Sequence, residues 1–368
     1  MRSYLQQVAT GPELSKSISR EAARDAMRMI LEQQLGPVQA GIYLIALRMK
    51  RETDEENRGS LNALLEVVDR VVVECDHLID IADPFNGYAR GIPATPFLGP
   101  VLAACGLNAY SHGLLTVGPK FGVTHHMVFA AAGIPVDLST AEAAERIADE
   151  RIGWAYVDQS NYLPQLHQLI ELRSQMVKRS CITTLEVLLG PLRAKGKTHL
   201  LTGYVHKNYP PVYSLLAREA GYDGAMIVRG VEGGCIPSLS QPARYFRYSD
   251  GCDDQEVRLT PAQVGIERSD RMIDIPLDLI KPTEVYLGSA DSGIVSAVDA
   301  RAVAAHCVEL GKEALDGKPG AMLDSLIYAS AICLLQSGHA TDLQQGASQA
   351  REAIRAGTAM QRLVAAQR

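Results

Sequence analysis

The stretch His77–Gly113, HLIDIADPFNGYARGIPATPFLGPVLAACGLNAYSHG, predicts a strand, a loop, a helix and a second strand in that order. HLIDIA and LNAYSHG are short and largely apolar, as buried strands are, and the turn residues in DPFNG end the first of them. ATPFLGPVLAACG, between them, has the length of a helix. Strands that alternate with helices are typical of a mainly parallel sheet, so this stretch predicts an α/β fold.

The same alternation continues toward the C-terminus. THHMVFAAAG (124–133) and STAEAAERIADE (139–150) predict helices, the second with a capping box formed by Ser139 and Glu142. The end of the chain, 320–364, predicts two long helices joined at a glycine-containing corner. Further strands are expected in KTHLLTGYVH (197–206), DGAMIVRGVEGG (223–234) and PTEVYLGS (282–289).

The N-terminal part of the chain predicts helices alone. SISREAARDAMRMILEQQL (17–35) has apolar residues at helical spacing, with Ser19 as its N-cap. VQAGIYLIALRMK (38–50) is a very apolar helix that ends in basic residues, and ETDEENRGSLNALLEVVDRVVV (52–73) begins acidic, as a helix start should. We therefore expect a small α-helical bundle over roughly the first 75 residues, followed by a large α/β domain.

Composition and charge limit the classes of protein to consider. The 368 residues are 47% hydrophobic and 21% charged, an ordinary globular composition, and the net charge of −6 argues against attraction of the whole surface to nucleic acid or membrane. The seven cysteines are scattered without a CxxC pair, which favours reduced thiols in a cytoplasm over disulfides or a zinc site. No apolar run approaches the ~20 residues of a membrane span, and the N-terminus lacks a signal-peptide core. We expect a cytoplasmic protein without a membrane partner.

Ligands of parallel α/β sheets bind at the carboxyl ends of the strands. Three predicted loops follow strands, at Asp83–Gly87, His112–Lys120 and Arg229–Gly234. If these loops meet, they form one cleft that faces the helical bundle, and this cleft is the expected ligand site.

The loop SHGLLTVGPKFGVTHH (111–126) carries the features of a phosphate site. Its glycines expose backbone N–H groups, Lys120 adds a positive charge, and a helix is expected to start near Thr124 with its positive end toward the loop. The alternative is a surface turn. His125 and His126 are adjacent, about 100° apart on a helix, and so poorly placed to share a metal ion; we expect no zinc.

Two other segments leave alternatives open. DPFNG could present Asp83 and the backbone at Asn86 and Gly87 to a ligand, or it could be a plain β-turn. Segment 168–250 has eleven Lys or Arg against six Asp or Glu, with tyrosines between them. It could hold phosphates or a nucleic-acid backbone, or it could be an ordinary solvated surface.

Several motifs resemble the anthranilate phosphoribosyltransferase family, glycosyltransferases that share a fold with pyrimidine nucleoside phosphorylases. The resemblance extends over nearly the whole chain, and the last two helices also fit. It rests on PVQAGIYLIALRMKRETDEE (37–56), ACGLNAYSHG (104–113), GPKFGVTHHMVFAAAGIPVDLS (118–139) and LLGPL (188–192).

The resemblance implies a small α-helical domain hinged to a large α/β domain with a mainly parallel central sheet, and a homodimer formed through the N-terminal helices. The small domain would comprise 1–75 plus roughly 160–185, and the large domain, with the ligand cleft, 76–159 and 186–368.

The resemblance also implies chemistry. In this tryptophan-biosynthesis family, phosphoribosyl pyrophosphate binds with Mg²⁺ in the cleft, an aromatic amine attacks the ribose, and no nucleotide redox cofactor takes part. No catalytic residue is assigned. The acceptor or a second ligand would be held by His125, Arg179, Lys207 and Arg229. The donor phosphates would be held by Asp83, Asn86, Gly87, Thr95, His112, Gly113, Lys120, Gly122 and Thr124.

The sequence departs from the family at the site. The Gly-Thr-Gly-Gly-Asp loop is replaced by ADPFNG, Lys-His-Gly by Ser111-His112-Gly113, and the magnesium-holding Asp-Glu pair by Cys235-Ile236, which leaves Glu232 as the nearby acid for a metal. Two hypotheses follow. One is a phosphoribosyltransferase-type enzyme with an altered acceptor or donor, which transfers phosphoribose to an aromatic nitrogen but has little activity toward anthranilate. The other is a non-catalytic member that binds nucleic acid or another phosphate-containing ligand.

Overall fold

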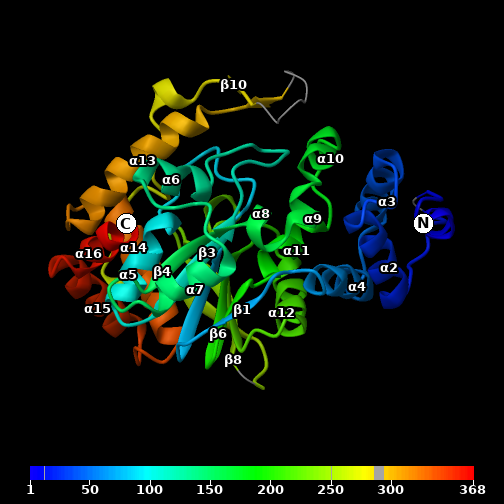
Figure 1. The fold of residues 1–368 in the computed structure, drawn as a ribbon. Helices are drawn as coiled ribbons and strands as arrows, with labels where there is room; N and C mark the ends of the chain where they lie inside the picture. Colours follow the sequence, from blue (N-terminus) through cyan, green and yellow to red (C-terminus); the bar gives the residue numbers. More distant parts are fainter. Residues whose placement is uncertain (12, 250, 286–293) are drawn as a thin grey trace.

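The computed structural model describes residues 1–11, 13–249, 251–285 and 294–368. Its N-terminal helices form a small group beside a larger α/β domain (Figure 1). Short helices from the middle of the chain pack between the two, where α10 contacts α3 and α11 contacts α4. The small group consists of α1 (Arg2–Val8), α2 (Arg20–Leu31), α3 (Pro37–Lys50) and α4 (Asp54–Leu65). The middle helices are α8 (Gln159–Tyr162), α9 (Pro164–His167), α10 (Ile170–Gln175) and α11 (Ile182–Leu185).

Local signals explain where the N-terminal helices start and stop. The Ser19 side chain accepts a hydrogen bond from the backbone N–H of Ala22 and caps α2, as predicted. Thr53 and Glu56 form a capping box at the start of α4. The expectation that this helix runs on to Val73 is wrong, since Val71–Val73 form strand β1, parallel to β5 (Leu192–Ala194). Three consecutive valines favour a strand because of their branched side chains.

The main sheet of the described chain has seven strands in the order β4-β3-β2-β6-β7-β8-β9. The first five are parallel, while β8 and β9 are antiparallel, so the expected mainly parallel sheet is confirmed. The strands are β2 (His77–Ala82), β3 (Asn108–Gly113), β4 (Trp154–Asp158), β6 (Lys197–Gly203), β7 (Gly224–Val228), β8 (Ala243–Ser249) and β9 (Gln255–Leu259).

Sequence patterns missed some strands and misplaced another. β4, β8 and β9 were not predicted. In PTEVYLGS, β10 (Thr283–Glu284) pairs only with β11 (Val295–Ser296), outside the main sheet, and 286–289 lie outside the described residues.

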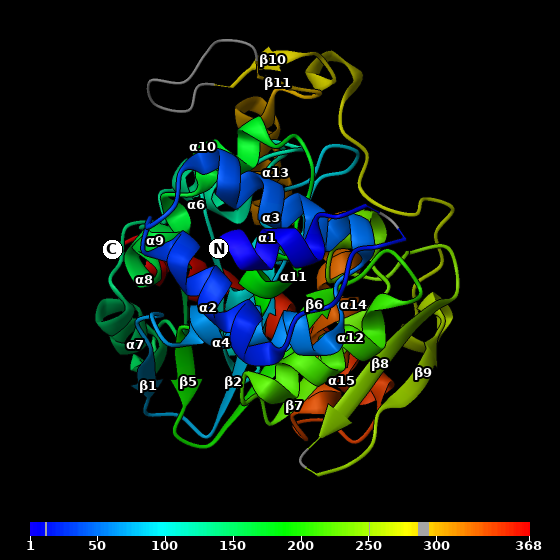
Figure 2. The same ribbon diagram turned by 90° about the vertical axis from the view of Figure 1, so that its right-hand side faces the viewer.

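Helices cover both faces of the sheet (Figure 2). Alternate residues of β2 face opposite cores: Ile79 and Ile81 pack in the core that includes α5, α6 and the C-terminal helices, and Leu78 and Ala82 in the core shared with the N-terminal helices. The covering helices are α5 (Leu98–Ala104), α6 (His125–Ala132), α7 (Thr140–Ala148), α12 (Tyr209–Glu219), α13 (Ala300–Leu315), α14 (Ala321–Gln336), α15 (Leu343–Arg355) and α16 (Thr358–Ala366).

The C-terminal segment forms α14, α15 and α16 where two long helices were expected. Gly338 and Gly357 take left-handed φ angles of 77° and 75° and separate them, because glycine adopts this conformation without steric cost. The capping box of Ser139 and Glu142 at α7 is present as predicted. Within the described residues, no helix is both long and apolar enough to cross a membrane.

Three histidines meet at the end of the sheet where the parallel strands begin. The His77 ring stacks on that of His199 at a centroid distance of 5.6 Å and meets His339 edge to face at 5.4 Å. Burial, and then the neighbouring charge of His339 and of Lys197, lower the pKa of His77, against the opposing effect of Asp76 and Asp223.

This cluster predicts a loss of stability in acid. A histidine with a lowered folded pKa stabilises the fold above its unfolded pKa of about 6.5, and that contribution is lost as the pH falls through the folded pKa. We therefore expect His77→Gln to flatten the decrease in unfolding free energy between about pH 7.5 and about pH 5.5 in urea titrations. His306→Gln, on the outer side of α13, is the control. An unchanged slope in His77→Gln would refute the assignment.

Candidate functional site

The three loops predicted to meet do meet. The backbone N–H of Gly122 donates to the carbonyl of Asn86 at 2.9 Å, and Lys120 Nζ lies 3.1 Å from Glu232 Oε2. Gly87 has a φ of +73°, and a Cβ there would lie 2.5 Å from the carbonyl carbon of Gly122. The two glycines therefore let the backbones of the two loops cross at close range. The sequence pattern predicted that these glycines bind phosphate, and the contacts give them this structural role as well.

A cleft of about 180 Å³ opens between these loops and the helical part of the chain. The helical side contributes Arg48 at the end of α3, and Arg179 and Thr183 near α11. The sheet side contributes backbone and side chains of the loops after β2, β6 and β7. Of the predicted site residues, Asn86, Arg179 and Glu232 line it. The other lining residues are Ala82, Pro84, Phe85, Ser180, Thr184, Val187, Thr202, Gly203, Tyr204, Val205, His206, Tyr209, Tyr213 and Gly233.

Asp83 is buried at a junction of loops. Its Oδ1 accepts hydrogen bonds from the Tyr88 hydroxyl at 2.9 Å and from the Cys235 backbone N–H at 3.0 Å. Its Oδ2 accepts from the Thr95 hydroxyl and from His125 Nε2, the latter at 3.0 Å. Burial alone would raise the pKa of Asp83, but the hydrogen bonds from His125, Thr95 and Cys235 lower it, so the carboxylate stays charged. Asp83, Thr95 and His125 thus bond one another.

His112 belongs to a second buried cluster. Its Nε2 lies 3.0 Å from Asp80 Oδ1, and its Nδ1 lies 3.0 Å from the Tyr162 hydroxyl oxygen. A void of about 10 Å³, the size of a single water molecule, lies beside it. Its lining residues are Asp83, Pro84, Phe85, His112, Gly113, Leu114, Thr124 and His125.

The remaining predicted residues lie at the margins. Thr124 caps α6 by accepting from the Met127 backbone N–H. Lys207 and Arg229 are exposed and are not among the described residues that line the cleft. His126 bonds Asp158 at 2.7 Å, so the adjacent histidines have different carboxylate partners.

Glu232 lines the cleft and forms an ion pair with Lys120 behind it. The Glu232 side chain is 6% exposed and that of Lys120 is 16% exposed. Burial lowers the pKa of Lys120, partly offset by the Glu232 carboxylate beside it. The Tyr88 ring lies 5.6 Å from the ammonium group. Burial and the Asp83 charge raise the pKa of Tyr88, so its hydroxyl stays protonated and donates to Asp83.

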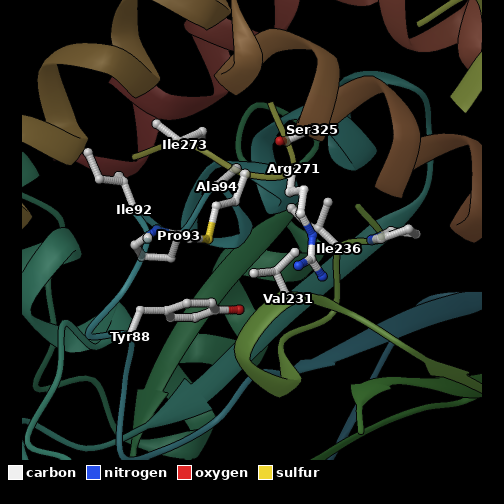
Figure 3. Close-up of a pocket in the computed structure, with 12 residues that line it drawn as sticks. Tyr88, Ile92, Pro93, Ala94, Val231, Ile236, Arg271, Ile273 and Ser325 are labelled. Carbon is white, nitrogen blue, oxygen red and sulfur yellow. The ribbon is translucent and has the colours of Figure 1, made fainter. Parts of the chain in front are cut away.

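Cys235 and Ile236, which stand where the resemblance places the metal-holding acids, do not fit magnesium. Cys235 is buried, and burial raises the pKa of its thiol, which therefore stays neutral. Ile236 lines an apolar pocket with Tyr88, Val231 and the guanidinium group of Arg271 (Figure 3). No group of three or more His, Cys, Asp or Glu within the described ranges could hold a metal ion. Mg²⁺ prefers carboxylate and water oxygens, which these residues do not supply.

Sequence patterns did not assign several residues of the cleft. Arg48 lies in the basic end of the apolar helix 38–50, which was interpreted only as a helix signal. Thr183 lies four residues after the predicted Arg179 and was given no role of its own. Tyr204, Tyr209 and Tyr213 were noted as tyrosines of the basic segment without a place in the cleft. Arg271, which lines the pocket of Ile236 and not the cleft, also had no local motif that could have indicated it.

Comparisons with known proteins agree with this architecture. The model of the helical bundle domain of a glycosyl transferase family matches residues 2–67, and the model of the a/b domain of that family matches residues 92–274. The chain belongs to this glycosyl transferase family. The predicted relationship to anthranilate phosphoribosyltransferases is thereby confirmed at the level of the family.

Individual relatives of the family cover nearly the whole chain. The anthranilate phosphoribosyltransferase of Rhodopseudomonas palustris (strain BisB18) is 25% identical over 98% of this chain and 96% of its own. That of Acidithiobacillus ferrooxidans (strain ATCC 53993 / BNL-5-31) is 27% identical over 98% and 95%.

Solved structures of family members share the fold. The anthranilate phosphoribosyltransferase of Thermus thermophilus superposes with a TM-score of 0.72 at 18% identity, over 100% of this chain and 98% of that one. The Saccharomyces cerevisiae enzyme, solved in complex with PRPP and Mg, gives 0.75 at 17% identity, over 99% and 95%. The small helical domain and the α/β domain with a mostly parallel sheet are therefore those of this glycosyl transferase family.

Proposed function

We propose that the cleft binds a phosphate-containing ligand without the help of magnesium, and that transfer of phosphoribose to anthranilate is negligible. The observation that carries the proposal is the replacement of the metal-holding acids by Cys235 and Ile236. Glu232, the remaining acid, has both carboxylate oxygens occupied by protein donors. A transferase of this kind needs its leaving pyrophosphate neutralised, and these residues give a metal little to bind.

The charge for the ligand would come from protein cations. Arg48 and Arg179 lie on the helical side of the cleft, and an arginine can bind phosphate through two parallel hydrogen bonds. The hydroxyl-bearing residues Ser180 and Thr183 also line the cleft and would supply further donors. The S. cerevisiae relative was solved with PRPP, which makes PRPP the first ligand to test here.

Single-stranded nucleic acid is a second candidate ligand. A row of aromatic rings lines the cleft, in which His206 and Tyr209 are 6.2 Å apart and Tyr209 and Tyr213 are 6.0 Å apart between centroids. Lys207 is exposed beside them. Aromatic rings that stack on bases, next to cations that contact the backbone, are the common means of binding single strands.

We further infer a cytoplasmic homodimer formed through the N-terminal helices.

Calorimetry distinguishes these ligands. We expect PRPP to bind with an affinity that magnesium changes little, and Arg179→Ala to weaken binding about tenfold, or ~1.4 kcal/mol, because a charged hydrogen-bond partner is lost. The control is Arg151→Ala, whose side chain is 84% exposed and pairs with Asp149 on the α/β domain. An oligonucleotide that binds while PRPP does not would establish the second candidate.

Robust anthranilate transfer that depends on magnesium would contradict the proposal. It would mean that other acids hold the metal. Glu232→Gln and Asp83→Asn would then show which of the two carboxylates has taken that role.

A further inference from the structure

The carboxylate of Glu232 lies where an anion would bind. Its Oε1 accepts hydrogen bonds from the backbone N–H groups of Arg90 at 2.6 Å and Gly91 at 2.9 Å. Its Oε2 accepts from the backbone N–H of Ala89 at 3.2 Å and from Lys120 Nζ at 3.1 Å. Three successive backbone N–H groups and one ammonium group therefore converge on one anionic side chain. Converging amides of this kind, with a lysine, are what phosphate-binding loops provide.

The chain is folded tightly to place this carboxylate. Glu232 has a φ of +56°, in the left-handed region that residues with a side chain rarely adopt. Glycines surround it, and a Cβ at Gly230 would lie 1.8 Å from the carbonyl oxygen of Gly234. Strained backbone of this kind persists where the surrounding structure holds it, and it is concentrated at ligand sites and switches.

The site also borders open space. Glu232 and Gly233 line the cleft, so a ligand in the cleft can reach the carboxylate from one side. Arg179, which also lines the cleft, is close enough for its charge to act on Lys120. In an ordinary buried ion pair the two side chains satisfy each other. The three backbone donors and the adjoining cavity therefore indicate a site for an anion.

We propose that the N–H groups of Ala89, Arg90 and Gly91 with Lys120 form a phosphate seat, and that Glu232 occupies it as an internal competitor. A phosphomonoester or pyrophosphate group offers more negative charge and more acceptor oxygens than one carboxylate, so it binds the same donors when Glu232 moves out. The displaced carboxylate turns toward the cleft by rotation of its side chain and of the backbone at Gly233, the residue that follows it. Glu232 thereby sets the affinity of the seat for phosphate. The seat is defined by the hydrogen bonds of Glu232 and does not depend on which ligand the cleft takes.

The test uses the full chain and inorganic pyrophosphate as the probe, in magnesium-free buffer. We expect Glu232→Ala to bind pyrophosphate at least about tenfold more tightly than the unmodified protein in calorimetry, because the donors are left free. Pyrophosphate should also raise the melting temperature of this variant more than that of the unmodified protein. The double variant Glu232→Ala, Lys120→Met should lose the gain.

Matched variants keep the result interpretable. Glu352→Gln removes the same charge from the exposed face of α15, where it pairs with Arg355, and should bind pyrophosphate as the unmodified protein does. If Glu232→Ala does not fold, Glu232→Gln keeps the length and one acceptor oxygen and is measured in the same way.

The proposal is overturned by an equal gain in Glu352→Gln, by a gain that survives Lys120→Met, or by no gain in the Glu232 variants. Loss of PRPP binding in Arg179→Ala with no gain in the Glu232 variants would remove the seat and leave the proposed function standing.

Discussion

Replacing Asp83 with alanine is expected to lower the free energy of unfolding by ~3–5 kcal/mol, because it breaks a buried ionic network from one side. The carboxylate accepts hydrogen bonds from Tyr88, Thr95, His125 and the backbone N–H of Cys235. Without it, these donors stay buried and lose their acceptor. Each buried donor left without its acceptor costs ~1–3 kcal/mol.

Thr95→Val is the matched control for this variant. It removes a single donor and leaves the carboxylate with its other partners, so a loss of about 1 kcal/mol is expected. Urea denaturation followed by circular dichroism measures both. A loss below about 1 kcal/mol in Asp83→Ala would show that the network is dispensable.

Glutamate at both Ile42 and Met49 is expected to convert a homodimer into a monomer. Both lie with Val38 on one exposed face of α3. In the single chain, Ile42 is 48% exposed, Met49 74% and Val38 71%. An apolar groove of about 470 Å³, lined by residues of α1 and α3, lies along the same face. An exposed apolar stripe of this extent is typical of a surface that a second copy covers, and burying two carboxylates in such a contact is prohibitive.

Light scattering measures this directly. The unmodified chain should show about twice the 39.8 kDa mass of one chain, and the double variant the mass of one. Leu277→Glu, at an 87% exposed apolar position on the α/β domain, should leave the dimer intact. A concentration-independent monomer of the unmodified chain would exclude the dimer.

Local signals in the sequence were sufficient for most of the fold. The helix caps at Ser19 and Ser139 follow from side-chain chemistry within four residues, and the strands β2 and β3 from short apolar runs with turn residues after them. The strands β8 and β9 were not predicted. Their sequences, ARYFRYS and QEVRL, carry charges, and they owe their conformation to pairing with β7 and with each other. Pairing between distant segments leaves little trace in the local pattern.

The site was less accessible than the fold. Sequence could predict that the three loops meet, since parallel strands place their ends together. It could not predict that Asp83 and His125 would bond one another in the interior, because aspartate and histidine serve equally well as side chains that bind a ligand in a cleft. Nor could it show that Glu232 would accept from the amides of residues 89–91, which are 141 to 143 positions away in the chain.

The meeting of the loops has a consequence for how a ligand is received. In many phosphate-binding proteins, the loop becomes ordered only when the ligand arrives, and part of the interaction energy is consumed by that ordering. Here, groups of the protein itself tie the loops together: the N–H of Gly122 donates to the carbonyl of Asn86, and the N–H of Cys235, in the loop after β7, donates to Asp83. These bonds preorganise the loop backbones at Asn86 and Cys235, so the part of the cleft floor that moves in the proposed competition is confined to Glu232 and the glycine after it.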